Sequence, residues 1–96
     1  MAVINLSRTI PETEEFARKV CAENNGTMTE LGIHWSVRAS PQLVIKRGTF
    51  DEVYKTRPKW EQDALWWGTI LSYEGNLTKQ SEDGYIIEDD VTKPMV

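Results

Sequence analysis

One aromatic stretch constrains this chain more than any other: residues 58–74, which hold three of the four tryptophans. Apolar side chains recur in it three or four residues apart, the spacing that gathers them on one face of a helix. The first row consists of Trp60, Ala64, Trp67 and Leu71, and a second row beside it of Trp66, Ile70 and Tyr73. Pro58 suits a first helical turn, and Gly75 suits a helix end. The pattern predicts a helix over 58–74 whose broad apolar face packs against the core or against a partner.

The side chains of the adjacent residues Trp66 and Trp67 are expected to point in different directions. Successive helix positions are about 100° apart, so neighbouring side chains cannot both point into the same core. If the row that contains Trp60 faces the sheet, Trp67 is buried and Trp66 lies at the flank of that face. We therefore expect Trp67 to stabilise the fold and Trp66 to be exposed to a partner.

The chain has 96 residues, enough for one domain with one modest core. We expect residues 1–90 to form a single compact domain and residues 91–96 a mobile acidic end. No apolar run approaches the roughly 20 residues that cross a bilayer, and the first residues lack the pattern of a secretory signal. Cys21 is the only cysteine, so no intrachain disulfide can form. These features predict a cytoplasmic protein.

The remaining patterns predict an α+β fold. Residues 31–39 alternate between apolar and polar, and residues 42–47 form a second apolar run after Ser40-Pro41, so we expect a central antiparallel hairpin over about 31–47. Further expected elements are a short edge strand at 2–6, a helix that starts with a capping box at Thr9–Glu12 and ends at Asn24-Asn25-Gly26, a short helix at 49–54 and a last edge strand at 85–87. Together they predict a small antiparallel sheet packed against two or three helices.

Nothing in the sequence matches a catalytic or metal-binding pattern. His34 is the only histidine, and no nucleophile motif accompanies it. Cys21 lies near the C-terminal end of its predicted helix, where the helix dipole opposes thiolate formation. The acidic runs 82–83 and 88–90 lack the spacing of a calcium loop. We therefore expect no catalytic residue, no metal and no cofactor.

The charge distribution is uneven along the chain. Residues 33–60 carry six basic and two acidic side chains, whereas residues 61–96 carry two basic and eight acidic ones. Aromatic residues and His34 are interleaved with the basic ones, which are Arg38, Lys46, Arg47, Lys55, Arg57 and Lys59. Basic residues with aromatics can follow a phosphate backbone and stack bases, or the basic segment can simply complement the acidic ends. The pI of about 4.9 opposes nonspecific nucleic-acid binding.

These observations predict a small non-enzymatic binding domain, a monomer or homodimer, that docks on a larger macromolecule and inhibits or adapts it. In composition, though in no motif, the chain resembles phage-encoded inhibitors and the immunity proteins that neutralise toxins. The candidate partner-binding residues are Trp66, Trp60, Tyr54, Arg47, Lys55, Arg57 and Lys59. The alternative is a nucleic-acid-binding module that uses the basic, aromatic-interleaved segment 34–60; steep salt dependence of binding would identify it.

Overall fold

Two antiparallel sheets and three helices make up the computed structural model, which describes residues 1–89. The helices are α1 (Thr13–Glu23), α2 (Arg47–Val53) and α3 (Lys59–Gly68). The strands are β1 (Ala2–Ser7), β2 (Thr27–Leu31), β3 (His34–Ala39), β4 (Gln42–Lys46), β5 (Ile70–Glu74), β6 (Asn76–Gln80) and β7 (Gly84–Glu88). This arrangement confirms the predicted α+β class. The predicted mobile end, residues 91–96, lies outside the described residues.

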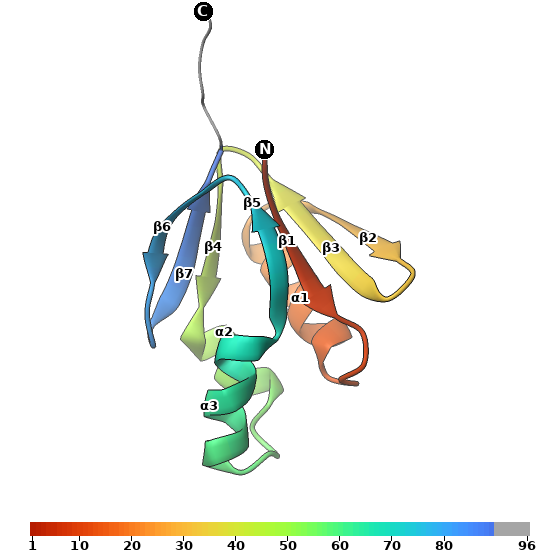
Figure 1. Cartoon of the computed structure of the whole chain (residues 1–96), viewed down its shortest axis with the longest axis vertical. Helices are drawn as coiled ribbons and strands as arrows, with labels where there is room; N and C mark the ends of the chain where they lie inside the picture. Colours follow the sequence, from red (N-terminus) through yellow and green to blue (C-terminus); the bar gives the residue numbers. More distant parts are fainter. Residues whose placement is uncertain (90–96) are drawn as a thin grey trace, which may run out of the picture.

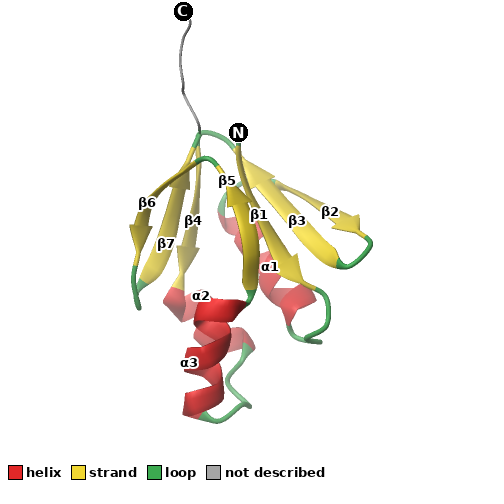
Figure 2. Cartoon of the chain, viewed as in Figure 1, coloured by secondary structure: helices red, strands yellow, loops and turns green. Residues whose placement is uncertain are grey.

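The first sheet has the strand order β2-β3-β1-β5, and the second sheet has the order β4-β7-β6. The chain passes from the first sheet into the second at two corners, from β3 to β4 through Ser40-Pro41 and from β5 to β6 through Gly75. Figure 1 shows that the sheets meet at these corners and spread apart toward α2 and α3. The helices and strands are therefore gathered into one wedge of two sheets, with helices at its wide end (Figure 2).

The core fills the space between the two sheets. In the first sheet Ile4 lies opposite Val37, and in the second Leu43 lies opposite Ile87; all four side chains are buried. A cluster of buried aromatic rings continues this core at the wide end and consists of Phe16, Phe50, Tyr54, Trp66 and Tyr85. Aromatic side chains bury large areas, so this cluster is a main source of apolar burial in so small a chain.

The predicted central hairpin over about 31–47 is wrong. Strands do form on both sides of Ser40-Pro41, but β3 pairs with β1 and β2, whereas β4 pairs with β7 in the other sheet. Alternation of apolar residues identifies a strand but does not say which strand it pairs with. The two-residue connection is a corner between sheets, and β1 and β7, both predicted as edge strands, are internal.

The predicted helix over 58–74 is only half correct. Helix α3 ends at Gly68, and the chain continues as β5, which pairs with β1. Glycine is a poor helix former, and Ile70 and Tyr73 are residue types that strands favour. The edge of β1 offers this segment a ladder of backbone hydrogen bonds, so pairing with the sheet overrides the helical spacing. The end of the first helix agrees better with its prediction, since Asn24 is its C-cap and Asn25 has a φ of 52°. Its start does not, because the helix begins at Thr13 and no side-chain capping hydrogen bond forms there.

Candidate partner-binding surface

The structure reverses the predicted burial of Trp66 and Trp67. Trp66 is 1% exposed and stacks on Tyr85 with the ring centroids 4.6 Å apart, and its indole N–H donates to the carbonyl oxygen of Ser81 at 2.9 Å. Trp67 is 49% exposed. The predicted helix phase was thus wrong by one position. Tyr54, a second candidate contact residue, is also buried, where it shares a hydrogen bond with Thr13.

The two candidate arginines are occupied by carboxylates of the same chain. Arg57 lies 2.7 Å from a carboxylate oxygen of Glu12 and 3.2 Å from one of Glu61. The hydrogen bond from Arg57 lowers the pKa of Glu12, although partial burial of that carboxyl opposes the shift. These pairs connect the start of α1 to the start of α3, so Arg57 has a structural role.

Arg47 likewise contacts Asp51 and Asp63, at 2.9 and 2.8 Å, and its guanidinium lies over the ring of Trp66. Its hydrogen bond lowers the pKa of Asp63, with a further contribution from Lys59. A guanidinium that is already paired twice has little capacity left for a phosphate group. The basic segment therefore contains a scaffold of internal ion pairs.

The other three candidates are exposed and lie together at the α2–α3 connection. Lys55 is exposed, the side chain of Lys59 is 81% exposed, and Trp60 is 71% exposed. They lie at the end of the molecule where α3 begins (Figure 1). Of the seven predicted contact residues, these three remain available to a partner.

Sequence reasoning missed a surface at the other end of α3, at the gap between β5 and β6. We call this gap the open seam; it is lined by Trp67, Ile70, Leu71, Ser72, Tyr73, Leu77, Gln80, Tyr85 and Ile87. These residues surround a pocket of about 180 Å³. Trp67, Leu71 and Tyr73 are each between 45% and 54% exposed. The open seam therefore contains an apolar pocket that solvent can reach, and it is not part of the buried core.

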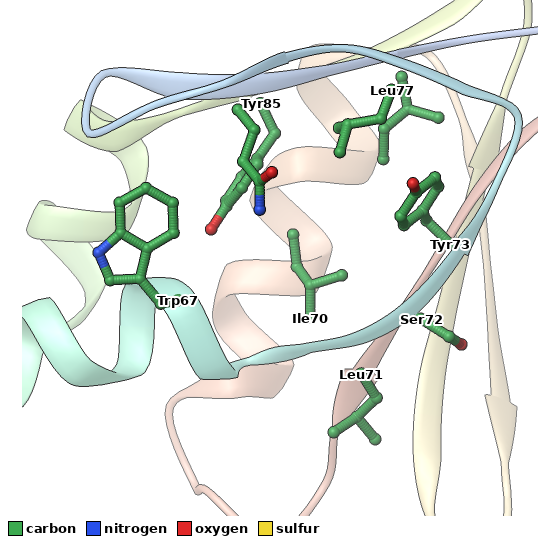
Figure 3. A pocket seen from close by; sticks show the side chains of 9 residues that line it. Trp67, Ile70, Leu71, Ser72, Tyr73, Leu77 and Tyr85 are labelled. Carbon is green, nitrogen blue, oxygen red and sulfur yellow. The ribbon is translucent and has the colours of Figure 1, made fainter.

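Figure 3 shows how the two sheets contribute to this pocket. Ile70 and Tyr73 point from β5 toward Tyr85 and Leu77 of the second sheet, while Leu71 points away from them. The ring of Trp67 stands edge-on to that of Tyr85, with centroids 6.1 Å apart. The shift from helix to strand after Gly68 is what places Tyr73 here. The signal available in the sequence was a poor helix former, Gly68, followed by the strand-favouring residue types Ile70 and Tyr73.

The lining of the open seam is uncharged. Burial raises the pKa of the Tyr85 phenol, and the nearby positive charge of Arg47 opposes this shift only in part. The phenol is therefore protonated at neutral pH, and its hydroxyl donates to the backbone oxygen of Trp66 at 2.7 Å. The hydroxyl is thus engaged within the protein, and the pocket presents mainly carbon atoms to an occupant.

The opposite side of the wedge is closed. We call this the closed seam: it lies between β3 and β4, and α1 packs against both strands. The side-chain amide of Asn24, at the end of α1, accepts a hydrogen bond from the N–H of Val44 at 2.8 Å and donates to its carbonyl oxygen at 3.0 Å. Asn24 thereby occupies the hydrogen-bonding edge of β4 as a neighbouring strand would.

Neither residue weighed for chemistry belongs to a cluster of reactive groups. His34 is half-buried at the start of β3, and Cys21 is half-buried and packs against the core. Among residues 1–89, no three side chains of the metal-ligating types come together. No helix in this part of the chain is long and apolar enough to cross a membrane.

Comparison with known proteins gives a likeness in fold. No protein-family model and no curated protein sequence matches this chain. Among solved structures, a chain in the structure of a phenol hydroxylase–regulatory protein complex superposes with a TM-score of 0.67 at 20% sequence identity. The superposition covers 91% of this chain and 95% of that chain, so the two are of nearly equal length. The two chains therefore share a fold over 91% of this chain.

Proposed function

We propose that this chain is a regulatory protein that binds a larger enzyme and changes its turnover without carrying out chemistry itself. The observation that carries the proposal is the exposed aromatic surface around α3 and β5, on a fold shared over 91% of this chain with a chain from a phenol hydroxylase–regulatory protein complex. Small size, free cysteine and the expected cytoplasmic location suit a subunit that associates with a separate enzyme.

The exposed side chains are of the kind that dominate binding energy. Trp60 and Trp67 are seven residues apart on α3, two turns along the same side of the helix. Trp67 continues into the open seam with Leu71 and Tyr73. Aromatic residues at the centre of an interface account for much of its affinity, and exposed contiguous apolar patches mark interaction sites. This surface is our candidate for the contact with the enzyme.

The neighbour's complex suggests the class of that enzyme. That structure is of a complex between a phenol hydroxylase and a regulatory protein, and we propose that the enzyme bound by this chain is likewise a hydroxylase. The regulatory effect can be activation, or it can be the inhibition that the composition suggested. Nucleic-acid binding through segment 34–60 is disfavoured, because its Arg47 and Arg57 are paired with carboxylates of the same chain.

Reconstitution tests this proposal. The affinity-tagged chain would be used to isolate its enzyme from the source cells, and the turnover of that enzyme would be measured as the chain is added back. We expect a saturable change in turnover near a 1:1 ratio. Trp60→Ala should weaken binding by at least tenfold, and Ile33→Ala, an equally exposed site at the β2–β3 turn across the molecule (Figure 1), should change it less than twofold.

Two results would contradict the proposal. One is an enzyme whose turnover is the same with and without the chain at saturating concentration. The other is conversion of the enzyme's substrate by this chain alone.

A further inference from the structure

The edges of the two sheets differ in how they are protected. An exposed strand edge presents unpaired backbone N–H and C=O groups, and proteins usually block it with charge, a bulge or a covering element. The edge of β4 is covered by the amide of Asn24. The edge strand β2 carries Glu30, which pairs with Arg8. The edge strand β6 carries Lys79 beside an irregularity in its register.

Strand β5 is the least protected of these edges. It is the last strand of the first sheet and pairs only with β1. Its sequence Ile-Leu-Ser-Tyr-Glu has no charge before Glu74. The irregularity in its register falls at Leu71, so the run from Ser72 to Glu74 pairs regularly with Asn5, Ile4 and Val3. Its other edge borders the pocket of the open seam.

The size and lining of the pocket define what can enter it. A cavity of about 150 Å³ lined by aliphatic and aromatic side chains holds one benzene ring, and this pocket has about 180 Å³. Its walls carry no charged side chain, and Trp67 and Tyr85 stand edge-on to each other beside it. Offset and edge-on contacts are the favoured geometry for a further ring. One neutral six-membered ring therefore fits, while a charged group would be desolvated without a partner.

We propose that the open edge of β5 binds an extended segment of the partner enzyme, which adds to the first sheet as a strand and places one aromatic side chain in the pocket. The unpaired edge favours a polypeptide over a free small molecule, because backbone hydrogen bonds along Ser72–Glu74 supply affinity and the pocket supplies specificity. This inference rests on the proposed function and names the site and the chemistry of its contact.

A defined peptide tests the inference on the isolated full chain. The probe is acetyl-Thr-Val-Phe-Val-Thr-amide, its matched control has Ala in place of Phe, and toluene represents the ring alone. Binding would be followed by amide and methyl chemical shifts of the ¹⁵N- and ¹³C-labelled chain. We expect the Phe peptide to shift the amides of 72–74 and the methyl groups of Ile70 and Leu77, and to bind at least tenfold more tightly than the Ala peptide.

Filling the pocket provides the second measurement. Ile70→Phe adds a ring within the pocket and should weaken binding of the Phe peptide by at least fivefold. Ile33→Phe makes the same substitution at the exposed β2–β3 turn and should leave binding unchanged. If Ile70→Phe does not fold, Leu77→Phe enters the same pocket from the second sheet.

Three outcomes would overturn the inference. In the first, toluene binds as tightly as the Phe peptide and the 72–74 amides do not shift, which makes the pocket a small-molecule site. In the second, the shifts fall on residues 27–31 of β2 instead. In the third, neither peptide binds at millimolar concentration. Because no enzyme is present, each result is independent of the reconstitution assay, which alone decides whether the chain is regulatory.

Discussion

The closed and open seams join the same two sheets, yet they differ in what covers them. At the closed seam α1 packs against β3 and β4, and Asn24 takes up the backbone groups at the edge of β4. At the open seam, within residues 1–89, no element lies between β5 and β6, and apolar side chains line a pocket instead. If the proposed docking surface is right, a fold that covers one edge and leaves the matching edge bare keeps stability and binding in separate places.

The largest expected difference between buried core and open seam is in the stability of variants at the adjacent residues Trp66 and Trp67. Trp66→Ala should destabilise the protein by about 3–5 kcal/mol, the cost of deleting a large buried aromatic side chain, because Trp66 is 1% exposed. Trp67→Ala at the open seam removes a half-exposed ring and should cost about 1 kcal/mol. Urea unfolding of both variants measures the difference. Equal losses of stability would show that the open seam is part of the structural core.

Asn24 tests the closed seam directly. Asn24→Ala removes hydrogen bonds to Val20 and Val44 and leaves the edge of β4 without a partner. We expect a loss of about 1–3 kcal/mol. The control Thr78→Ala removes a long, exposed hydrogen bond of 3.3 Å at the open side and should cost less than about 0.5 kcal/mol. If Asn24→Ala lowers the free energy of unfolding no more than Thr78→Ala does, the closed seam is not stabilised by Asn24 as described.

The smallest expected effect concerns pH and the pairing that ties α1 to α3. Arg57 lowers the pKa of Glu12 in the folded state, so the pair stabilises the fold fully above the unfolded-state pKa of about 4.3. This contribution is lost as the pH falls through the folded-state pKa. Glu12→Gln should therefore be less stable than the parent at pH 7, with the difference shrinking below about pH 4.

Exposed Glu15 provides the control for this measurement, since it lies on the same helix. Glu15→Gln should show little difference from the parent at either pH. If thermal unfolding shows the same pH dependence in the two variants, the Glu12–Arg57 pair does not have the role assigned to it.

The sequence predicted elements better than it predicted their pairing. The first helix and the strands around His34 and Leu43 follow from local periodicity, which depends only on neighbouring residues. The corner at Ser40-Pro41 was predicted to be a hairpin turn. The strands that actually pair there, β1 with β3 and β7 with β4, are distant in the sequence, so local periodicity does not indicate these pairings. Strand β5 was concealed for the same reason, since its pairing with β1 decides against a helical continuation of α3.

The candidate site was predicted only in part. Trp60, Lys55 and Lys59 are exposed as a contact surface requires, but the helix phase exchanged Trp66 with Trp67. That error follows from extending the helix to Glu74, because the apolar row through Leu71 then appeared to face the sheet. The pocket could not be predicted from the sequence, because the residues that line it belong to segments that come together only in the folded chain.

Hydrogen exchange of the chain in complex with its enzyme tests the central claim most directly. The account predicts that binding slows amide exchange in β5, residues 70–74, and leaves β2 at residues 27–31 unchanged. Backbone amides at an edge are unprotected until another strand pairs with them. Slower exchange in β2, with β5 as exposed in the complex as in the free chain, would contradict the claim that the open seam is the docking surface.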